Sequence, residues 1–309
     1  MTGIDARSVV VRVPAKVNLQ LSVGPKEEDG FHGVVTIFQA ISLFDDVTVS
    51  VAQVGAGINV SVAGDHVQGV PSDATNLAAK AASLMCDIYE IKPDLSIQIK
   101  KSIPVAGGMA GGSADAAATI VAIDALFSLG LSREEMHEVA GKIGSDVPFM
   151  LTGGTAVGIG RGDKVTSALS RGNYYWVLAL SSSGLSTPAV YGECDRLRAG
   201  MEVAQPRAND QILQSLLSAD AVSLGKELTN DLQAAACSLR PALRLILDVG
   251  SEYGALGSIV SGSGPTVAFL VSDEEHALDL AVALTSSGVV GSVTRASGPV
   301  HGAKVIEVS

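Results

Sequence analysis

The chain has 309 residues, of which 47% are hydrophobic, 17% charged and 4% aromatic, and its net charge at pH 7 is −11. This length and hydrophobic content predict two globular domains with a mainly aliphatic core, and the acidic balance excludes a general nucleic-acid binder, which would present a basic face. The three cysteines show neither C-x-x-C nor zinc-ligand spacing, so we expect buried free thiols and a cytoplasmic protein.

The chain begins with a long strand pattern. Residues 9–23 alternate, with apolar side chains at 17, 19, 21 and 23, and Lys16 and Asn18 fall together on the opposite face. A lysine within an otherwise apolar strand is either an exposed edge residue or a functional one. The residue pattern alone leaves both readings of Lys16 open.

A polar loop and further short elements follow. Phe31 and His32 come directly after the loop at 26–30, and an apolar segment then leads to a turn predicted at Asp45 and Asp46. Strands are expected at 47–51 and 58–62, and a helix capped by Ser72 or Asp73 is expected to run to about Tyr89.

The most distinctive stretch is a glycine-rich loop between a strand and a helix. Residues 95–101 alternate as a strand, residues 116–129 form an alanine-rich apolar run, and Pro104–Asp115 between them holds four glycines. Glycine lets a ligand approach the backbone closely, and the first N–H groups of a helix are unpaired and partly positive. The stretch therefore predicts a phosphate-binding loop, with a tight turn at a packed crossing as the alternative.

The spacing of these glycines excludes two common nucleotide loops. A Walker A loop needs a lysine after its last glycine, and none follows here. The dinucleotide fingerprint G-x-G-x-x-G is also absent from this stretch.

The rest of the chain predicts a second domain of mixed composition. Ser132 and Glu135 form a capping-box pattern for a helix that Gly144–Pro148 ends, and residues 149–159 are expected to return as strands. We place the domain boundary between Ser167 and Tyr174, which gives domains 1–168 and 169–309. Strands are then expected at 176–180, 258–260, 266–271 and 289–295, with a helix at 274–284.

Five segments occur in the order and spacing of a known family: Pro14–Asn18, Gly30–His32, Pro104–Asp115, Gly144–Pro148 and Ser261–Pro265. From about Val11 to Ala296 the chain resembles the GHMP kinases, and among them the branch that acts on a cytidine-diphosphate methylerythritol. That branch usually has tyrosine where this chain has Phe31, so the ring is kept and a hydroxyl is lost.

The resemblance implies a fold and an activity. The fold would be α+β, with an N-terminal ribosomal-S5-like domain, a C-terminal ferredoxin-like domain and the substrates in the cleft between them. The activity would be an ATP- and Mg²⁺-dependent kinase that phosphorylates the 2-hydroxyl of 4-(cytidine 5′-diphospho)-2-C-methyl-D-erythritol in the non-mevalonate pathway. A mevalonate- or homoserine-like GHMP kinase, and a non-catalytic small-molecule sensor on the same fold, are the alternatives.

The resemblance also implies roles for single residues. Lys16 and Asp146 would be the catalytic pair, with Asp146 accepting the proton of the substrate hydroxyl. Phe31, His32 and Tyr191 would hold the cytidine, and Asn18 and Thr187 the diphosphate or the methylerythritol hydroxyls. The ATP-binding residues would be Asn76, Leu77, Lys101, Pro104, Val105, Ala106, Gly107, Gly108, Met109, Ala110, Gly111, Gly112, Ser113, Ala114 and Asp115.

We assign no dedicated metal ligand, although Ser113 at the helix start can reach a phosphate or the Mg²⁺. The expected partner is the small-molecule substrate, with no nucleic acid and no membrane, since no apolar run reaches about 18 residues. A monomer or weak homodimer is expected.

Overall fold

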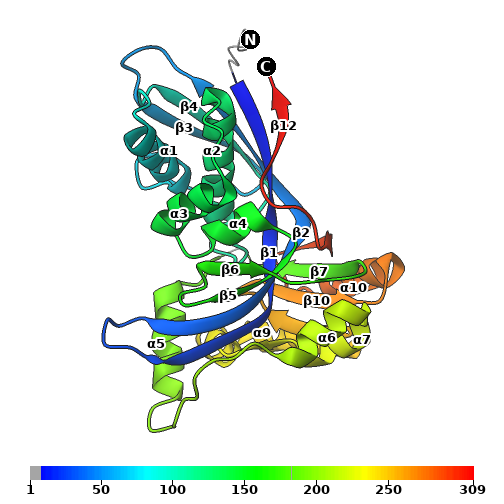
Figure 1. Ribbon diagram of the computed structural model, residues 1–309. Coiled ribbons are helices and arrows are strands. Elements are labelled where there is room, and N and C mark those ends of the chain that lie inside the picture. Colours follow the sequence, from blue (N-terminus) through cyan, green and yellow to red (C-terminus); the bar gives the residue numbers. More distant parts are fainter. Residues whose placement is uncertain (1–7, 182) are drawn as a thin grey trace.

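The computed structural model describes residues 8–181 and 183–309, which form two sheets with helices packed around them (Figure 1). The first sheet has eight strands in the order β12-β1-β2-β4-β3, with β5, β6 and β8 attached at its sides. Its strands are β1 (Ser8–Lys26), β2 (His32–Val51), β3 (Ile58–Gly64), β4 (Leu95–Lys101), β5 (Thr155–Ile159), β6 (Lys164–Ser167), β8 (Thr229–Asn230) and β12 (Lys304–Val308). None of the described helices is both long and apolar enough to cross a membrane.

The two longest strands, β1 and β2, pair with each other at the centre of the first sheet. The two strands are antiparallel over nearly their whole length, with register shifts after Pro14, Asn18 and Val23. Residues 13–21 of β1 are all buried, because protein covers both faces of the strand there. The extended pattern predicted for residues 9–23 is confirmed, and the strand reaches further than expected.

The turn predicted at Asp45 and Asp46 is wrong, because β2 runs straight through both residues. Asp45 is fully buried, where it accepts hydrogen bonds from the backbone N–H groups of Ser102 at 2.6 Å and Ile103 at 2.9 Å. Asp46 pairs with Arg12 on the neighbouring strand at 2.8 Å. Both carboxylates are therefore satisfied by partners distant in sequence, which lets two usual turn residues lie in a strand.

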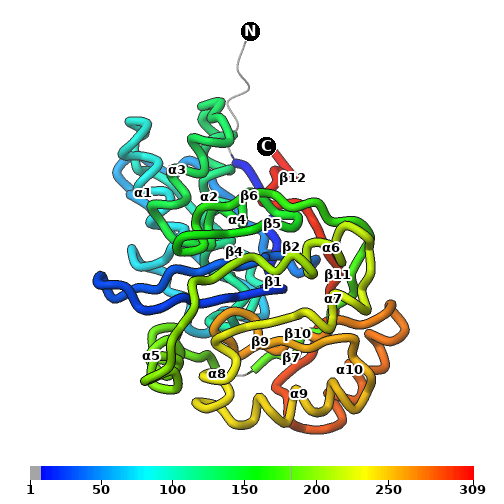
Figure 2. Tube along the Cα trace, turned by 60° about the horizontal axis from the view of Figure 1, so that its bottom comes forward, coloured from blue at the N-terminus to red at the C-terminus, as the bar shows by residue number. Residues whose placement is uncertain are grey.

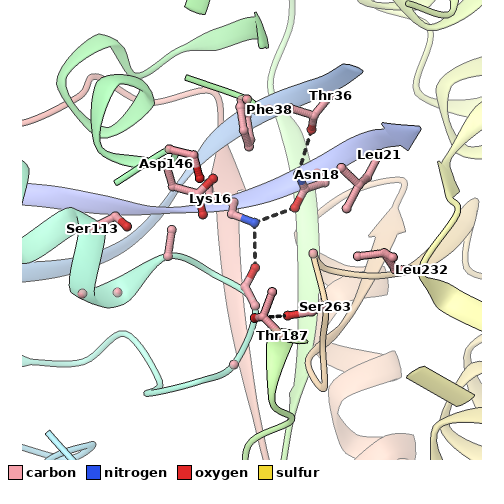
Figure 3. A pocket seen from close by; sticks show the side chains of 18 of the residues that line it. Lys16, Asn18, Leu21, Thr36, Phe38, Ser113, Asp146, Thr187, Leu232 and Ser263 are labelled. Carbon is pink, nitrogen blue, oxygen red and sulfur yellow. Dashed lines mark hydrogen bonds between the residues drawn. The ribbon is translucent and has the colours of Figure 1, made fainter. Parts of the chain in front are cut away.

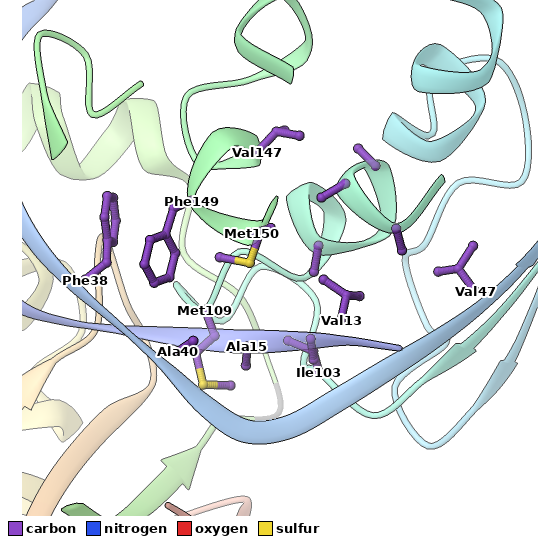
Figure 4. Close-up of a cluster of buried hydrophobic side chains, with 14 of the residues drawn as sticks. Val13, Ala15, Phe38, Ala40, Val47, Ile103, Met109, Val147, Phe149 and Met150 are labelled. Carbon is purple, nitrogen blue, oxygen red and sulfur yellow. The ribbon is translucent and has the colours of Figure 1, made fainter. Parts of the chain in front are cut away.

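Four helices cover one side of the first sheet: α1 (Leu77–Tyr89), α2 (Gly111–Phe127), α3 (Arg133–Ile143) and α4 (Val147–Thr152). The alanines of α2 are buried around most of its circumference, so this helix lies at the centre of the core. In the same core the rings of Phe38 and Phe149 stack with centroids 4.7 Å apart, beside Met109 and Met150 (Figure 4).

Two details of these helices differ from the sequence expectation. The N-cap of α1 is Asn76 rather than Ser72 or Asp73, since its side chain accepts from the N–H of Ala78 at 2.8 Å. Residues 147–152 form α4, although strands were expected from residue 149, because a proline at position 148 fits the first turn of a helix. The capping box of Ser132 and Glu135 at the start of α3 is confirmed.

The second sheet has the order β11-β7-β10-β9 and consists of β7 (Tyr174–Leu180), β9 (Gly257–Val260), β10 (Val267–Val271) and β11 (Ser292–Gly298). The helices of this part are α5 (Thr187–Leu197), α6 (Asp210–Ser218), α7 (Ala221–Glu227), α8 (Gln233–Leu239), α9 (Ala242–Glu252) and α10 (Glu274–Ser287). Figure 2 shows α9 and α10 along the outer side of the sheet. The expected strands in this region are confirmed, although β11 begins at Ser292 rather than at 289.

Side chains on the two faces of β7 pack against different parts of the molecule. Val177 and Ala179 pack with α9 and α10, whereas Trp176 and Leu178 face the core of the first sheet. The indole N–H of Trp176 donates to Gln39 of β2 at 2.9 Å. The division at residue 168 stays a prediction; β8 and β12 come later in the chain but pair with β1.

Candidate active site

A cavity of about 440 Å³ lies where β1, β2, the glycine loop, α5 and the 261–264 turn meet (Figure 3). Lys16, Asn18 and Asp146 line it from the first part of the chain. Thr187 and Ser263 line it from the second part, and their hydroxyl oxygens are 2.8 Å apart. The cavity thus collects polar side chains from both parts of the chain.

Lys16 is almost completely buried at the wall of this cavity. Its Nζ donates to Oδ1 of Asn18 at 2.6 Å and to the carbonyl of Gly108 at 2.8 Å. Burial lowers the pKa of Lys16, and the nearby charge of Asp146 opposes that shift. With only neutral acceptors bound, the ammonium remains available to an anionic group entering the cavity.

Asp146 lies at the start of α4, on the same wall as Lys16 (Figure 3). It occupies the N-cap position, but its side chain makes no capping hydrogen bond. Because the carboxylate is not used for capping, it can accept a proton from a hydroxyl placed in the cavity.

The glycine loop approaches this pair from the opposite side. Helix α2 begins after Ala110, which has φ 61° and provides no side-chain cap, so the first N–H groups of the helix have no capping side chain. Ser261 donates to the carbonyl of Gly108 at 3.0 Å, and the N–H of Thr266 donates to that of Gly107 at 3.3 Å. The second part of the chain therefore fixes the loop in place.

A substitution at Gly108 tests whether this loop binds the phosphates of ATP. It has φ +78°, and a Cβ built there would collide with the carbonyl oxygen of Ser261. Overpacking costs about 1–3 kcal/mol, so we expect Gly108→Ala to raise KM for ATP about tenfold. Gly130→Ala is the matched control, since Gly130 has φ +68° and no atom near its Cβ position. An equal KM for ATP in both folded variants would contradict the loop assignment.

The predicted ATP residues fall into three groups. Pro104, Ala106, Gly107, Gly108, Ala110, Gly111, Gly112 and Ser113 line the main cavity. Asn76, Val105, Lys101 and Asp115 line a cavity of about 180 Å³ beside it, and the two cavities share Leu77, Ala106 and Gly112. Met109 and Ala114 are instead fully buried in the hydrophobic core.

The polar atoms around the small cavity are largely engaged within the protein. Lys101 forms ion pairs with Asp45 and, at 2.9 Å, with Asp115, and all three side chains are buried. Asn76 uses its amide to cap α1 and to donate to the carbonyl of Pro71 at 2.7 Å. Contact of their side chains with a nucleotide stays a prediction.

A second cavity of about 690 Å³ contains the residues predicted for the cytidine. The rings of His32 and Tyr191 are tilted with centroids 5.2 Å apart. Phe31 is 54% exposed, and the guanidinium of Arg161 lies 3.9 Å from the centroid of its ring. Burial, with the charge of Asp146 adding, raises the pKa of Tyr191 to about 12, which keeps its phenol neutral.

The two larger cavities adjoin each other, since Val34, Ser145, Arg161, Thr187 and Tyr191 line both. Arg161 and Thr36 were not predicted from the sequence as site residues; Thr36 accepts from the amide of Asn18 at 2.8 Å. Asp195, which lies 2.7 Å from His32, was not predicted either. Residues 187, 191 and 195 are spaced by four on α5, so they share one face of the helix, and this spacing was the available signal.

Comparison with known proteins decides the family. Residues 76–154 match the profile of the GHMP kinase N-terminal domain, and residues 212–290 match that of the C-terminal domain. The 4-diphosphocytidyl-2-C-methyl-D-erythritol kinase of Mycolicibacterium smegmatis is 51% identical over 98% of this chain and 94% of its own. The chain belongs to the GHMP kinase family.

Other relatives of this GHMP kinase support the same assignment. The 4-diphosphocytidyl-2-C-methyl-D-erythritol kinase of Thermobifida fusca is 51% identical over 97% of this chain and 98% of its own. A crystal structure of 4-(cytidine 5′-diphospho)-2C-methyl-D-erythritol kinase is 28% identical, with a TM-score of 0.73 over 93% of this chain and 98% of its own. Homoserine kinase from Cytophaga hutchinsonii, 19% identical with a TM-score of 0.75 over 99% of both chains, shares the fold. The predicted α+β GHMP kinase fold is confirmed.

Proposed function

We propose that this GHMP kinase transfers the γ-phosphoryl group of ATP to the 2-hydroxyl of 4-(cytidine 5′-diphospho)-2-C-methyl-D-erythritol, in the non-mevalonate pathway. Relatives that are 51% identical over nearly the whole chain carry the name of that kinase. The structural observation behind the proposal is that the Lys16–Asp146 cavity adjoins the cavity of Phe31, His32 and Tyr191. An acceptor with a hydroxyl at one end and a base at the other suits such a pair.

Lys16 and Asp146 carry the chemistry in this proposal. Phosphoryl transfer depends mainly on positioning and on stabilising charge on the transferred group. Asp146, whose carboxylate is not used as a helix cap, accepts the proton of the attacking hydroxyl. The buried ammonium of Lys16 orients that hydroxyl and holds the negative charge that develops next to it.

The glycine loop and the start of α2 are proposed to hold the ATP phosphates. Gly107, Gly108 and residues 110–113 line the cavity, and none of them carries a large side chain. Among residues 8–181 and 183–309, no three His, Cys, Asp or Glu side chains gather as a metal site. Ser113 lines the cavity at the start of α2, and its hydroxyl would be the protein ligand of a Mg²⁺ ion held otherwise by phosphates and water, which would neutralise charge on the transferred group.

The remaining expectations complete the proposal. Phe31 and Tyr191 are proposed to stack on the cytosine, and Asn18 and Thr187 to contact the diphosphate or the methylerythritol hydroxyls. A cytoplasmic location and a monomer or weak homodimer stay predictions.

Acceptor specificity tests the function. We expect ADP release from ATP and Mg²⁺ with the cytidine-diphosphate methylerythritol, and none above background with mevalonate or homoserine, because neither contains a base for the aromatic cavity. Turnover of mevalonate or homoserine at a comparable kcat/KM would overturn the proposed acceptor. A thermal shift with the cytidine compound but no ADP release would instead identify a non-catalytic sensor.

A further inference from the structure

His32 has a carboxylate partner that the proposed function does not use. The side chain of His32 is only 7% exposed, and its Nε2 lies 2.7 Å from Oδ1 of Asp195 on α5. The other oxygen of Asp195 pairs with Lys26 at the end of β1, 3.4 Å away. Asp195 therefore links the ends of β1 and β2 to α5 at one wall of the aromatic cavity.

This contact determines which nitrogen of His32 carries the proton. A carboxylate paired with a lysine has only acceptor atoms, so Nε2 of the histidine must donate and must carry the hydrogen. In the neutral ring the remaining nitrogen, Nδ1, then has a free lone pair and is an acceptor. Within the described part of the chain, no group forms a hydrogen bond with Nδ1 of His32. The ring itself is held by Tyr191, 5.2 Å away between centroids.

An acceptor at this position distinguishes cytosine from uracil. Cytosine carries an amino group at C4, which is a donor, whereas uracil carries a carbonyl oxygen there, which is an acceptor. A lone pair on Nδ1 can accept from the amino group and repels the carbonyl. The opposite tautomer, with the hydrogen on Nδ1, would reverse this preference.

We propose that Asp195 is a positioning residue that holds His32 in the Nε2–H tautomer and thereby selects a cytidine over a uridine acceptor. This inference rests on the proposed function, because it requires the base to bind in the cavity of His32. Asp195 does not touch the transferred group, so its effect falls on the choice of base and not on the chemical step.

The test compares Asp195→Asn with a matched variant, Asp163→Asn. An asparagine amide can either accept from or donate to Nε2, so it no longer imposes one tautomer. We expect Asp195→Asn to lower the cytidine-to-uridine ratio of kcat/KM about tenfold, the discrimination that one base contact provides. Saturating kcat with the cytidine acceptor and KM for ATP should stay near wild type. Asp163 lines the same cavity, and its carboxylate accepts a hydrogen bond from the backbone N–H of Arg161. Asp163→Asn should therefore leave the cytidine-to-uridine ratio unchanged.

A spectroscopic measurement separates tautomer fixing from mere packing. The chain has five histidines, so the ¹⁵N signals of His32 can be assigned by their loss in His32→Gln. We expect the Nε2–H tautomer in the wild type and a mixture in Asp195→Asn. Since Asp195 is 32% exposed on a surface helix, the variant should keep its fold, which thermal unfolding checks.

Different results would overturn the role of Asp195 and the proposed kinase activity. A folded wild type that does not phosphorylate the cytidine acceptor overturns the proposed function, and the base selection with it. An active wild type whose Asp195→Asn variant keeps the full cytidine-to-uridine ratio overturns the role of Asp195 alone. A wild-type His32 with its hydrogen on Nδ1 overturns it as well, whatever the kinetics show.

Discussion

Asp146→Asn is expected to lower kcat about 10²–10⁴-fold, the usual contribution of a positioned general base. The amide keeps the size of the side chain but cannot take the proton of the acceptor hydroxyl. KM for both substrates should change little, since no helix cap is lost with the carboxylate. Steady-state kinetics of Asp146→Asn beside Asp163→Asn, which alters a carboxylate of the neighbouring cavity, measures the effect.

Lys16→Ala should reduce kcat in the same range, because the lysine and the aspartate line one wall and act on the same hydroxyl. If they act as one unit, the double variant loses less than the product of the two single losses. Turnover close to wild type in either single variant would remove that residue from the catalytic role.

The second large effect concerns stability. Lys101→Met is expected to lower the free energy of unfolding by about 3–5 kcal/mol, because it leaves the buried carboxylate of Asp45 without its cation and removes the hydrogen-bond donor to Asp115. Lys100→Met is the control, since Lys100 is the exposed neighbour on the same strand. Urea unfolding of both variants at neutral pH measures the difference. A loss in Lys101→Met no larger than in Lys100→Met would contradict the importance of the buried ion pairs.

Asp115→Asn should behave differently, because the pKa of Asp115 is strongly raised. Burial, opposed by the charge of Lys101 and reinforced by that of Asp45, raises the pKa of Asp115 from 3.8 to about 8. Its Oδ1 is buried without a hydrogen-bond partner, whereas Asp45 accepts from two backbone N–H groups. Folding therefore favours the protonated form of Asp115, and an amide mimics that neutral form.

The sign of the pH dependence follows from this raised pKa. The stabilisation that Asp115 contributes is complete below the unfolded-state pKa near 3.8 and is lost as the pH rises towards about 8. Asp115→Asn should flatten the fall in unfolding free energy over that window. An unchanged slope would show that Asp115 is ionised in the folded protein.

Local sequence patterns predicted the parts of the fold that depend on neighbouring residues. The strand–glycine loop–helix around Gly107 and the capping box of Ser132 follow from spacing and propensity, and both are found. Asp45 could not be placed in this way, because its partner Lys101 is 56 residues away along the chain. Short α4 was missed because Pro148 was assigned to the end of the preceding helix, whereas it lies in the first turn of α4.

The candidate site shows the same limit. The structure brings Lys16, Asn18 and Asp146 into one cavity, where the family resemblance had placed them together. Asp195 was missed because its spacing by four from Thr187 and Tyr191 indicates a shared helix face, but not that this face lies against His32. Pairs that form between distant elements become visible only in the folded chain.

The position of β12 has a consequence for how the protein is made. β12 pairs with β1 through Val9–Arg12, so the earliest described strand receives its outer neighbour from the last one. On the ribosome, domains form as their residues emerge. Here the edge of β1 at residues 9–12 has no partner strand until synthesis has passed residue 304, long after α1–α4 have emerged. Because unpaired strand edges invite association with other chains, we expect the incomplete chain to associate more readily than the finished one.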